Sequence, residues 1–348
     1  MVSTKVLFLA DEKIPALLKR LSKTYRVFAP VQVSDTAVLF QQFSDGAQLA
    51  LGKQASIPPK EAIFPQTERL MSYTYAKDLE NLTKSTIKLN QDIKADPTVL
   101  FGARPCDVQG LAIFKTVFTQ GQWTDASVKA RLDATIFVTL LCDQPEVTCF
   151  CSSVGGGPTS TGGSDLVLIP VTGGYGAEAV TEKGKTILQD EAFTPARDKE
   201  IKEAKKVRDT VGVEERLELD KISQRILKLF STDFWERVSA TCISCGACTY
   251  VCPACYCFNI TDEPAGMSGD RIRTWDSCMF YQYTLEASGH NPRPTKAERY
   301  RNRIGHKFSY HPTNYEGIFG CSGCGRCIKA CPVSLDIRQV LREATTHG

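Results

Sequence analysis

The sequence of 348 residues predicts an α/β first half followed by a cysteine-rich α+β second half. Three observations lead to this prediction. Short apolar runs alternate with a helix-length amphipathic segment in the first half, as in parallel βαβ units. Of the 15 cysteines, none precedes Cys106 and most lie between Cys242 and Cys331. Within that region, one cysteine spacing occurs twice.

Composition and charge exclude several classes of protein. Charged residues make up 23% and hydrophobic residues 42% of the chain, close to globular averages, which excludes wholesale disorder. The net charge of +3 is too small to indicate a nucleic-acid or membrane-surface protein. We find no apolar run long enough to span a membrane and no export signal, and therefore expect a cytoplasmic protein. Because disulfides are rare in that compartment, metal ligation is the first explanation for so many cysteines.

The first half shows a strand–helix–strand pattern. We expect a short helix over residues 15–22, a buried strand over 98–102, a helix over 107–118 whose apolar residues share one face, and strands over 134–141 and Leu166–Val171. Sites in parallel sheets lie beyond the carboxyl ends of the strands. Cys106 and Cys142 each follow one of these strands. We therefore expect both at the same edge of the sheet.

Two segments, a predicted loop and a charged linker, indicate how the chain is divided into domains. Residues 152–164 are rich in Gly, Ser and Thr and predict a loop. Residues 197–230 mix charges of both signs with apolar positions, which is typical of one or two solvated linker helices. We therefore expect an α/β partner-docking domain over residues 1–195, a helical linker over 196–235 and a cysteine-rich domain over 236–348.

The repeated motif carries the chemistry. Residues 242–253 read CISCGACTYVCP and residues 321–332 read CSGCGRCIKACP. Both are C-x2-C-x2-C-x3-C-P, the spacing of bacterial ferredoxins with two [4Fe–4S] clusters. Zinc sites pair two C-x2-C units and have no use for the third cysteine or the Cys-Pro. The fold class is therefore an α/β amino-terminal domain followed by an α+β bacterial-type two-[4Fe–4S] ferredoxin domain with a long insert.

The ligands are expected to cross between the motifs. Three thiolates of one loop hold three corners of a cube, and the fourth cysteine points to the other cluster. Glycines at 246, 323 and 325 let each loop turn tightly and aim N–H groups at sulfur. The prediction is one cluster on Cys242, Cys245, Cys248 and Cys331, and a second on Cys321, Cys324, Cys327 and Cys252.

Several segments resemble one family. These are CISCGACTYVCPACYCF, RTWDSCM, GHNPRPTKAERYRNRIGHKF, CSGCGRCIKACP, and in the first half ARPCD with the C-x6-C-x-C of Cys142, Cys149 and Cys151. Together they resemble the beta subunit of sulfhydrogenases and the related iron–sulfur subunit of anaerobic sulfite reductase. The resemblance runs from about residue 101 to the C-terminus.

The resemblance implies an iron–sulfur electron-transfer subunit of an oxidoreductase complex in anaerobic metabolism. Such a subunit passes single electrons between a terminal hydrogenase or reductase subunit and a flavin- and NAD(P)-binding reductase-like subunit, which holds the FAD and NAD(P). Two other functions compete. One is a catalytic reductase subunit, in which a cluster with an open coordination site reduces a substrate directly. The other is a scaffold whose clusters only brace the fold.

Four cysteines of the first half form a second candidate site. Cys106 and Cys142 are expected at the same sheet edge, with Cys149 and Cys151 in the loop just beyond. We expect a third iron–sulfur cluster on these four. The alternatives are buried free thiols, which pack as small hydrophobes, or a redox pair.

The insert between the motifs leaves open questions. Cys255, Cys257 and Cys278 are one thiolate short of a full ligand set. They could support another cluster with a non-Cys ligand, replace a ligand in the crossed assignment, or pack near the clusters as non-ligating thiols, and we leave them unassigned. The histidines, at 290, 306, 311 and 347, show no metal spacing. We find no dinucleotide fingerprint, serine elbow, nickel site or haem-attachment motif. A basic segment is either a solvated helix or a docking face for an acidic partner or a flavin phosphate; its cations are Arg293, Lys296, Arg299, Arg301, Arg303 and Lys307.

Overall fold

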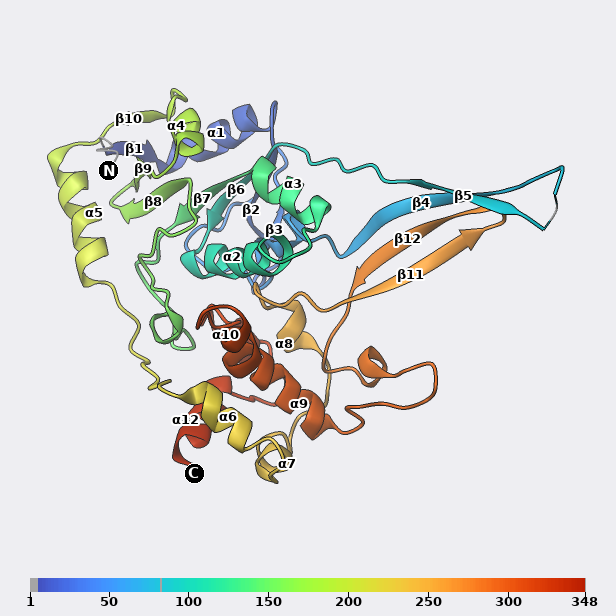
Figure 1. Cartoon of the computed structure of the whole chain (residues 1–348). Coiled ribbons are helices and arrows are strands. Elements are labelled where there is room, and N and C mark those ends of the chain that lie inside the picture. The colour runs from blue at the N-terminus through green and yellow to red at the C-terminus, as the bar shows by residue number, and fades with distance from the viewer. Residues whose placement is uncertain (1–5, 82, 348) are drawn as a thin grey trace.

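An eight-stranded sheet forms the centre of the first half in this computed structural model, which describes residues 6–81 and 83–347. Its strands are β1 (Leu7–Ala10), β2 (Arg26–Gln32), β3 (Val38–Gln42), β6 (Thr98–Ala103), β7 (Thr135–Leu140), β8 (Leu166–Val171), β9 (Gly174–Ala179) and β10 (Phe193–Pro195). The spatial order is β10-β1-β9-β8-β7-β6-β2-β3 (Figure 1). The four central strands β2, β6, β7 and β8 are parallel, and the flanking strands pair antiparallel.

Helices cover both faces of this sheet. Val99 and Phe101 point to one face and pack in one core, whereas Leu100 points to the other and packs with Phe114. This alternation explains why β6 is apolar at almost every position. The first face carries α1 (Ile14–Leu21) and α4 (Glu182–Leu188); the second carries α2 (Pro105–Thr119), α3 (Ala126–Ala134) and α5 (Asp198–Thr210).

The strand–helix–strand prediction for the first half is confirmed. α1, β6, α2, β7 and β8 all occur where the apolar patterns indicate them, and β6 and β7 pair in parallel. Residues 197–230 contain two helices, as expected, but the first of them is not a solvated linker. Ala204 of α5 is buried against Val167 and Ile169 of β8, so this charged helix belongs to the cover of the sheet.

Short helices around a separate core form the cysteine-rich region. That core includes Phe234, Trp235, Ile304, Phe308 and Leu341. One long helical segment crosses it, because α9 continues without a break into a π-helix and then α10. The helices are α6 (Ile222–Lys228), α7 (Phe234–Val238), α8 (Ala247–Tyr250), α9 (Lys296–Gly305), the π-helix η5 (His306–Tyr310), α10 (His311–Asn314), α11 (Arg326–Lys329) and α12 (Ile337–Thr346).

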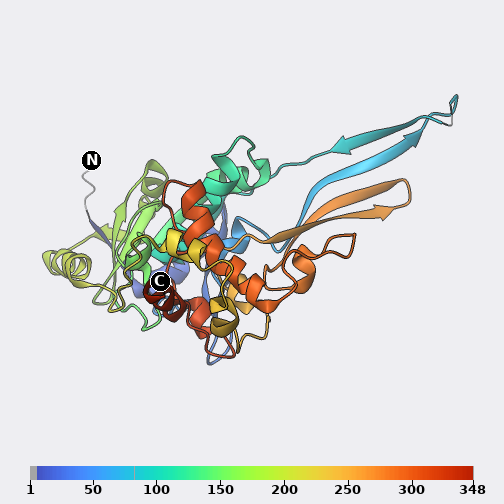
Figure 2. The same cartoon turned by 60° about the horizontal axis from the view of Figure 1, so that its bottom comes forward.

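A four-stranded antiparallel sheet projects from the molecule as an arm, and both views show it extending away from the remaining elements (Figures 1 and 2). Its strands are β4 (Thr67–Lys77), β5 (Ser85–Asn90), β11 (Phe258–Ala265) and β12 (Ser268–Trp275), in the order β11-β12-β4-β5. One hairpin comes from the first half and the other from the insert between the cysteine motifs. The two halves of the chain therefore share this sheet.

Buried charges fix the base of the arm. Arg273 of β12 bonds to Glu68 and to Asp125, each at 2.6 Å, and its guanidinium lies 4.8 Å from the ring centroid of Phe64. The indole N–H of Trp275 donates to the Phe64 carbonyl at 2.9 Å. In the described parts of the chain, no helix combines the length and apolar character required to cross a membrane.

Candidate metal centre

The two cysteine motifs fold into the same local structure. Gly246 (φ 75°) and Gly325 (φ 72°) each take the left-handed conformation and begin a four-residue helix, α8 and α11 respectively. The N–H of Ser244 donates to Cys242 Sγ at 3.4 Å, and the N–H of Gly323 donates to Cys321 Sγ at 3.4 Å. Backbone donors therefore point at the first sulfur of each motif, as cluster-binding loops require.

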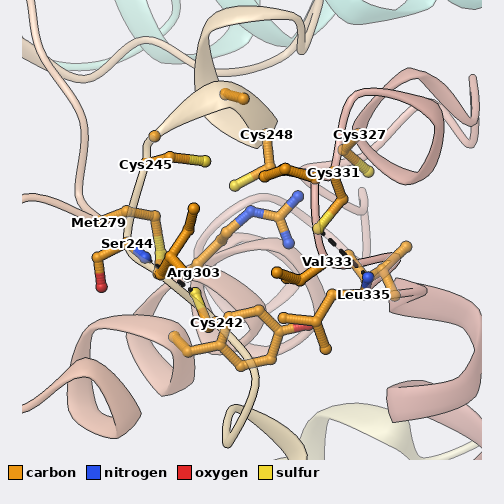
Figure 3. Close-up of a pocket in the computed structure, with 16 residues that line it drawn as sticks. Cys242, Ser244, Cys245, Cys248, Met279, Arg303, Cys327, Cys331, Val333 and Leu335 are labelled. Carbon is orange, nitrogen blue, oxygen red and sulfur yellow. Dashed lines mark hydrogen bonds between the residues drawn. The ribbon is translucent and has the colours of Figure 1, made fainter.

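A pocket gathers cysteines from both motifs (Figure 3). Cys242, Cys245 and Cys248 of the first motif line it together with Cys331, the last cysteine of the second motif. The N–H of Leu335 donates to Cys331 Sγ at 3.2 Å. This set is the first predicted ligand group, and folding brings all four members to one space.

The second predicted group lies beside the first. Cys252 is close enough to Cys321, Cys324 and Cys327 to influence the pKa of each thiol. Cys327 also lines the pocket of the first group, so the two groups adjoin. Contact between α8 and α11 brings the two motifs together.

The four amino-terminal cysteines also lie together. Cys106 stands in the first turn of α2 and Cys142 lies two residues after β7. Cys149 lies in the segment beyond, and Cys151 begins the short 3-10 helix η3 (Cys151–Val154). Electrostatic interactions connect Cys142 with the other three thiols. Cys106 and Cys149 also interact with Cys324 of the second motif. The quartet therefore borders the ferredoxin motif.

Close backbone contact joins these two sites. The N–H of Phe150 donates to the Gly323 carbonyl at 2.9 Å, and a Cβ on Gly323 would lie 2.5 Å from Cys151 Cα. Arg326 and Asp107 form a fully buried ion pair at 2.5 Å across the same seam. The loop of Cys149 and Cys151 thus packs directly on the loop of the second motif.

Burial keeps most of these thiols protonated when no metal is bound. Burial raises the pKa of Cys142 and Cys324 to about 11, and that of Cys151 and Cys321 to about 12. Metal ligation requires thiolates, so binding at these positions releases protons.

Three buried cations face the cysteines without a carboxylate partner among the described residues. Lys307 Nζ donates to Cys252 Sγ at 3.4 Å and to the Gly320 carbonyl at 2.7 Å. Burial opposes the charge of Arg303, but the thiols of Cys248 and Cys327 raise its pKa well above the ordinary value. In Figure 3 its guanidinium lies between Cys248 and Cys331.

Lys60, the third cation, donates to the carbonyls of Thr249 and Cys255. Burying an uncompensated cation is costly, so these sites require anions nearby, and thiolate-ligated clusters are anionic.

Both predictions for the basic segment of the insert, a solvated helix and a docking face, are wrong for three of its cations. Arg299, Arg303 and Lys307 are spaced by four residues and are buried, at 7%, 4% and 5% exposure. They are therefore neither a solvated face nor a docking face. The four-residue spacing indicates that these cations share one face of a helix. Because charge runs are usually solvated, the sequence did not predict that this face points inward.

The three unassigned cysteines of the insert lie together with two histidines. Cys255, Cys257 and Cys278 line a second pocket with His306 and His311, although the histidine spacing gave no metal signal. Among the described residues, no group of three or more His, Cys, Asp or Glu side chains lies within reach of a single metal ion. Each cysteine of a [4Fe–4S] cube binds a different iron, so cluster ligands surround a body rather than one point.

Comparison with known proteins agrees with this arrangement. Residues 241–335 match a family model described as a 4Fe-4S dicluster domain. Sulfhydrogenase 2 subunit beta of Pyrococcus furiosus is 27% identical over 343 residues, covering 96% of this chain and 97% of that protein. No solved structure gives a significant match. The chain therefore carries a 4Fe-4S dicluster domain and is a homologue, over nearly its whole length, of a sulfhydrogenase beta subunit.

Proposed function

We propose that this protein relays single electrons between the terminal catalytic subunit of a hydrogenase- or reductase-type complex and a flavin- and NAD(P)-binding subunit. One observation carries the proposal: Cys331 of the second motif lies in the same pocket as Cys242, Cys245 and Cys248 of the first. This crossing is the ligand exchange of two-cluster ferredoxins. It supports two neighbouring clusters, as an electron relay requires.

The ligand sets follow from this arrangement. We assign one [4Fe–4S] cluster to Cys242, Cys245, Cys248 and Cys331, a second to Cys321, Cys324, Cys327 and Cys252, and a third to Cys106, Cys142, Cys149 and Cys151. A bound cluster supplies a one-electron couple. The chain's own groups tune it: Lys307 and Arg303 stabilise added negative charge, and the N–H groups of Ser244, Gly323 and Leu335 donate to ligand sulfurs.

The contact between loops supports a continuous relay. Cys327 adjoins the first site, and the second motif packs on the loop of Cys149 and Cys151. The three sites thus form a row from the α/β half into the ferredoxin motifs. A cytoplasmic location is part of this proposal, because disulfides are rare there and the cysteines stay available to hold clusters.

The arm offers a surface for a neighbouring subunit. All six residues of β5 are exposed, including Ile87 and Leu89 at 55% and 63% exposure. Leu79 at the tip of this hairpin is 89% exposed. Exposed apolar side chains gathered on one projection indicate a protein-binding surface. Because the related chain is a subunit by name, we assign this surface to another member of the complex, with FAD and NAD(P) held by the flavin-binding partner.

A second function has one observation in its favour. A cavity of about 450 Å³ adjoins the amino-terminal cysteines and is lined by Cys142, Cys149, Arg104, Lys53 and Lys329. Its size and cations suit a small anion beside the third site. In this alternative the chain is itself a reductase that uses a cluster with an open coordination site.

Replacing Cys331 tests the relay. Cys331→Ser removes a cysteine of the second motif but is expected to destroy the cluster of the first, with a loss of about four irons per chain. Ser334→Ala, at an exposed position of the same loop, serves as the control. Unchanged iron content and unchanged electron paramagnetic resonance spectra in Cys331→Ser would refute the crossed arrangement.

Turnover separates the two functions. For the relay, purified chain with reduced viologen is expected to show reversible cluster signals and no steady consumption of the electron donor when sulfite or protons are supplied. Sustained consumption that is lost in Arg104→Gln would instead favour the reductase.

A further inference from the structure

The base of the arm brings together three cysteines that belong to none of the three sites described above. Cys255, Cys257 and Cys278 line one pocket. The pairing of β11 with β12 explains the approach of two of them. Phe258 pairs with Trp275, and the N–H of Asp276 donates to the Cys257 carbonyl at 3.0 Å. Cys257 directly precedes β11 and Cys278 follows β12 by three residues, so both lie beside this closing contact.

The thiols interact with each other. Cys278 donates a hydrogen bond to Cys257. Cys255 donates in the same way to Cys252. The three thiols are therefore one group beside the second predicted cluster, rather than scattered buried cysteines.

His311 supplies a fourth donor atom. The residue is 1% exposed and lines the same pocket. Its Nδ1 lies 2.7 Å from the Ile318 carbonyl, which can only accept, so Nδ1 carries the proton. Its Nε2 is buried and has no hydrogen-bond partner among the described residues. A buried imidazole that donates from Nδ1 to a carbonyl and leaves Nε2 free has the orientation of a metal-ligating histidine.

The neighbouring histidine does not have this arrangement. His306 also lines the pocket, but its Nε2 is 2.9 Å from the hydroxyl of Tyr256. The π-helix between the two histidines places His311 one π-turn after His306, with ring centroids 6.3 Å apart. The free nitrogen in the pocket is therefore that of His311.

Cations of the pocket favour an anionic occupant. Lys307 and Arg303 line it, and Lys60 donates to the Cys255 carbonyl at 3.2 Å. Neither Lys307 nor Arg303 has a carboxylate partner in the described part of the chain, whereas burial lowers the pKa of Lys60. Thiolates bound to metal would supply the missing negative charge.

We propose that Cys255, Cys257, Cys278 and His311 hold a further [4Fe–4S] cluster next to Cys252. A cube suits the site better than one zinc ion, because the four groups do not lie within reach of a single ion. With this site, every one of the fifteen cysteines belongs to a cluster. The site lies at the base of the arm, so it extends the row of sites toward the surface assigned to the partner.

The test uses full-length protein purified without oxygen, with iron per chain, zinc per chain and pulsed electron paramagnetic resonance as readouts. Wild-type protein is expected to hold about sixteen irons, and one reduced cluster is expected to show coupling to a nitrogen ligand. His311→Ala is expected to lose about four irons. His311→Cys, which keeps a donor atom, is expected to retain the iron and lose the nitrogen coupling.

The exposed His290→Ala is the matched control and is expected to match wild type. About twelve irons in wild type, unchanged in His311→Ala and without nitrogen coupling, would overturn the inference and leave the other three sites standing. One zinc per chain that is lost in His311→Ala, or a Cys257–Cys278 disulfide found by mass spectrometry, would also overturn it. Because the inference rests on the proposed iron–sulfur function, wild-type protein without iron would instead remove that function as well.

Discussion

At the scale of single residues, Lys307 shows most directly how this sequence tunes its site. The residue is 5% exposed, its ammonium group donates to Cys252 Sγ, and the described residues offer it no carboxylate. A charge so placed stabilises the reduced, more negative form of a cluster on Cys252.

Replacing this lysine should lower a reduction potential. Lys307→Met is expected to shift the second cluster by on the order of 100 mV to a more negative value, since a unit charge about 5 Å away contributes roughly 3 kcal/mol at an effective dielectric of 20. A redox titration followed by electron paramagnetic resonance measures the shift. Lys199→Met, on the exposed face of α5, is the control. Equal potentials in both variants would show that Lys307 does not face a redox centre.

A second residue-scale prediction concerns the ion pair across the seam. Asp107 and Arg326 are 0% and 1% exposed, so Asp107→Asn leaves a buried guanidinium without its counter-charge. We expect a loss of about 3–5 kcal/mol in the free energy of unfolding. Anaerobic denaturant titration measures it. Asp45→Asn, which breaks the exposed pair with Lys19, should leave stability within error. A similar small effect of both changes would contradict the role of the pair.

At the scale of elements, the approach of the second motif to the Cys149–Cys151 loop depends on a missing side chain. Gly323 (φ 64°) lies so close to Cys151 that any Cβ would force the loops apart. Gly173 (φ 80°) has a similar backbone conformation but open space around it. Comparing alanine substitutions at the two glycines therefore distinguishes the effect of backbone strain from the effect of close contact between the loops.

Gly323→Ala is expected to lose iron from the second and the amino-terminal sites, about four atoms or more per chain. Gly173→Ala should carry the same conformational cost, roughly 1 kcal/mol, and keep its iron. Iron and acid-labile sulfide analysis distinguishes them. If both variants keep full iron, the loops do not need this contact.

The sequence predicted some elements well because their patterns reflect burial. β6 and β7 are apolar runs between two helical layers, and α2 packs Leu111 and Phe114 against the sheet and Ile113 against the cysteine-rich half. The arm was not predicted, because β5 and most of β11 are exposed and lack a buried face. The pairing of β4 with β12 also joins segments far apart in the chain, and local patterns do not encode such contacts.

The candidate metal centre was likewise predicted only in part from the sequence. Motif spacing predicted which cysteines gather, since the first three cysteines of each motif lie in one tight loop and the fourth points to the other motif. The inward cations and His311 were missed, because their meaning depends on which face of α9 and its π-helical extension is buried. Charge runs usually face solvent, and here the anionic sites reverse that rule.

At the scale of the whole molecule, we assign partner binding to the arm and metal binding to the row of cysteine sites. The second motif and the amino-terminal cysteines lie where the two halves meet. The arm projects away from the remaining elements into solvent (Figure 2). If the arm binds the partner, changing its apolar residues should stop assembly and leave the metal sites intact.

The triple change of Leu79, Ile87 and Leu89 to Ser is expected to abolish co-elution with the flavin-binding subunit in size-exclusion chromatography. The cluster absorbance of the chain should stay at the wild-type value. Ile201→Ser, at 40% exposure on α5, is the control for loss of surface apolarity. Co-elution at full strength would show that the partner binds elsewhere.

The most direct test of the central claim is a quantitative redox titration of the full-length protein purified without oxygen, with iron measured on the same sample. The account predicts a brown protein with at least about eight irons per chain and signals that appear in one-electron steps on reduction. A colourless protein, or zinc in place of iron, would contradict it.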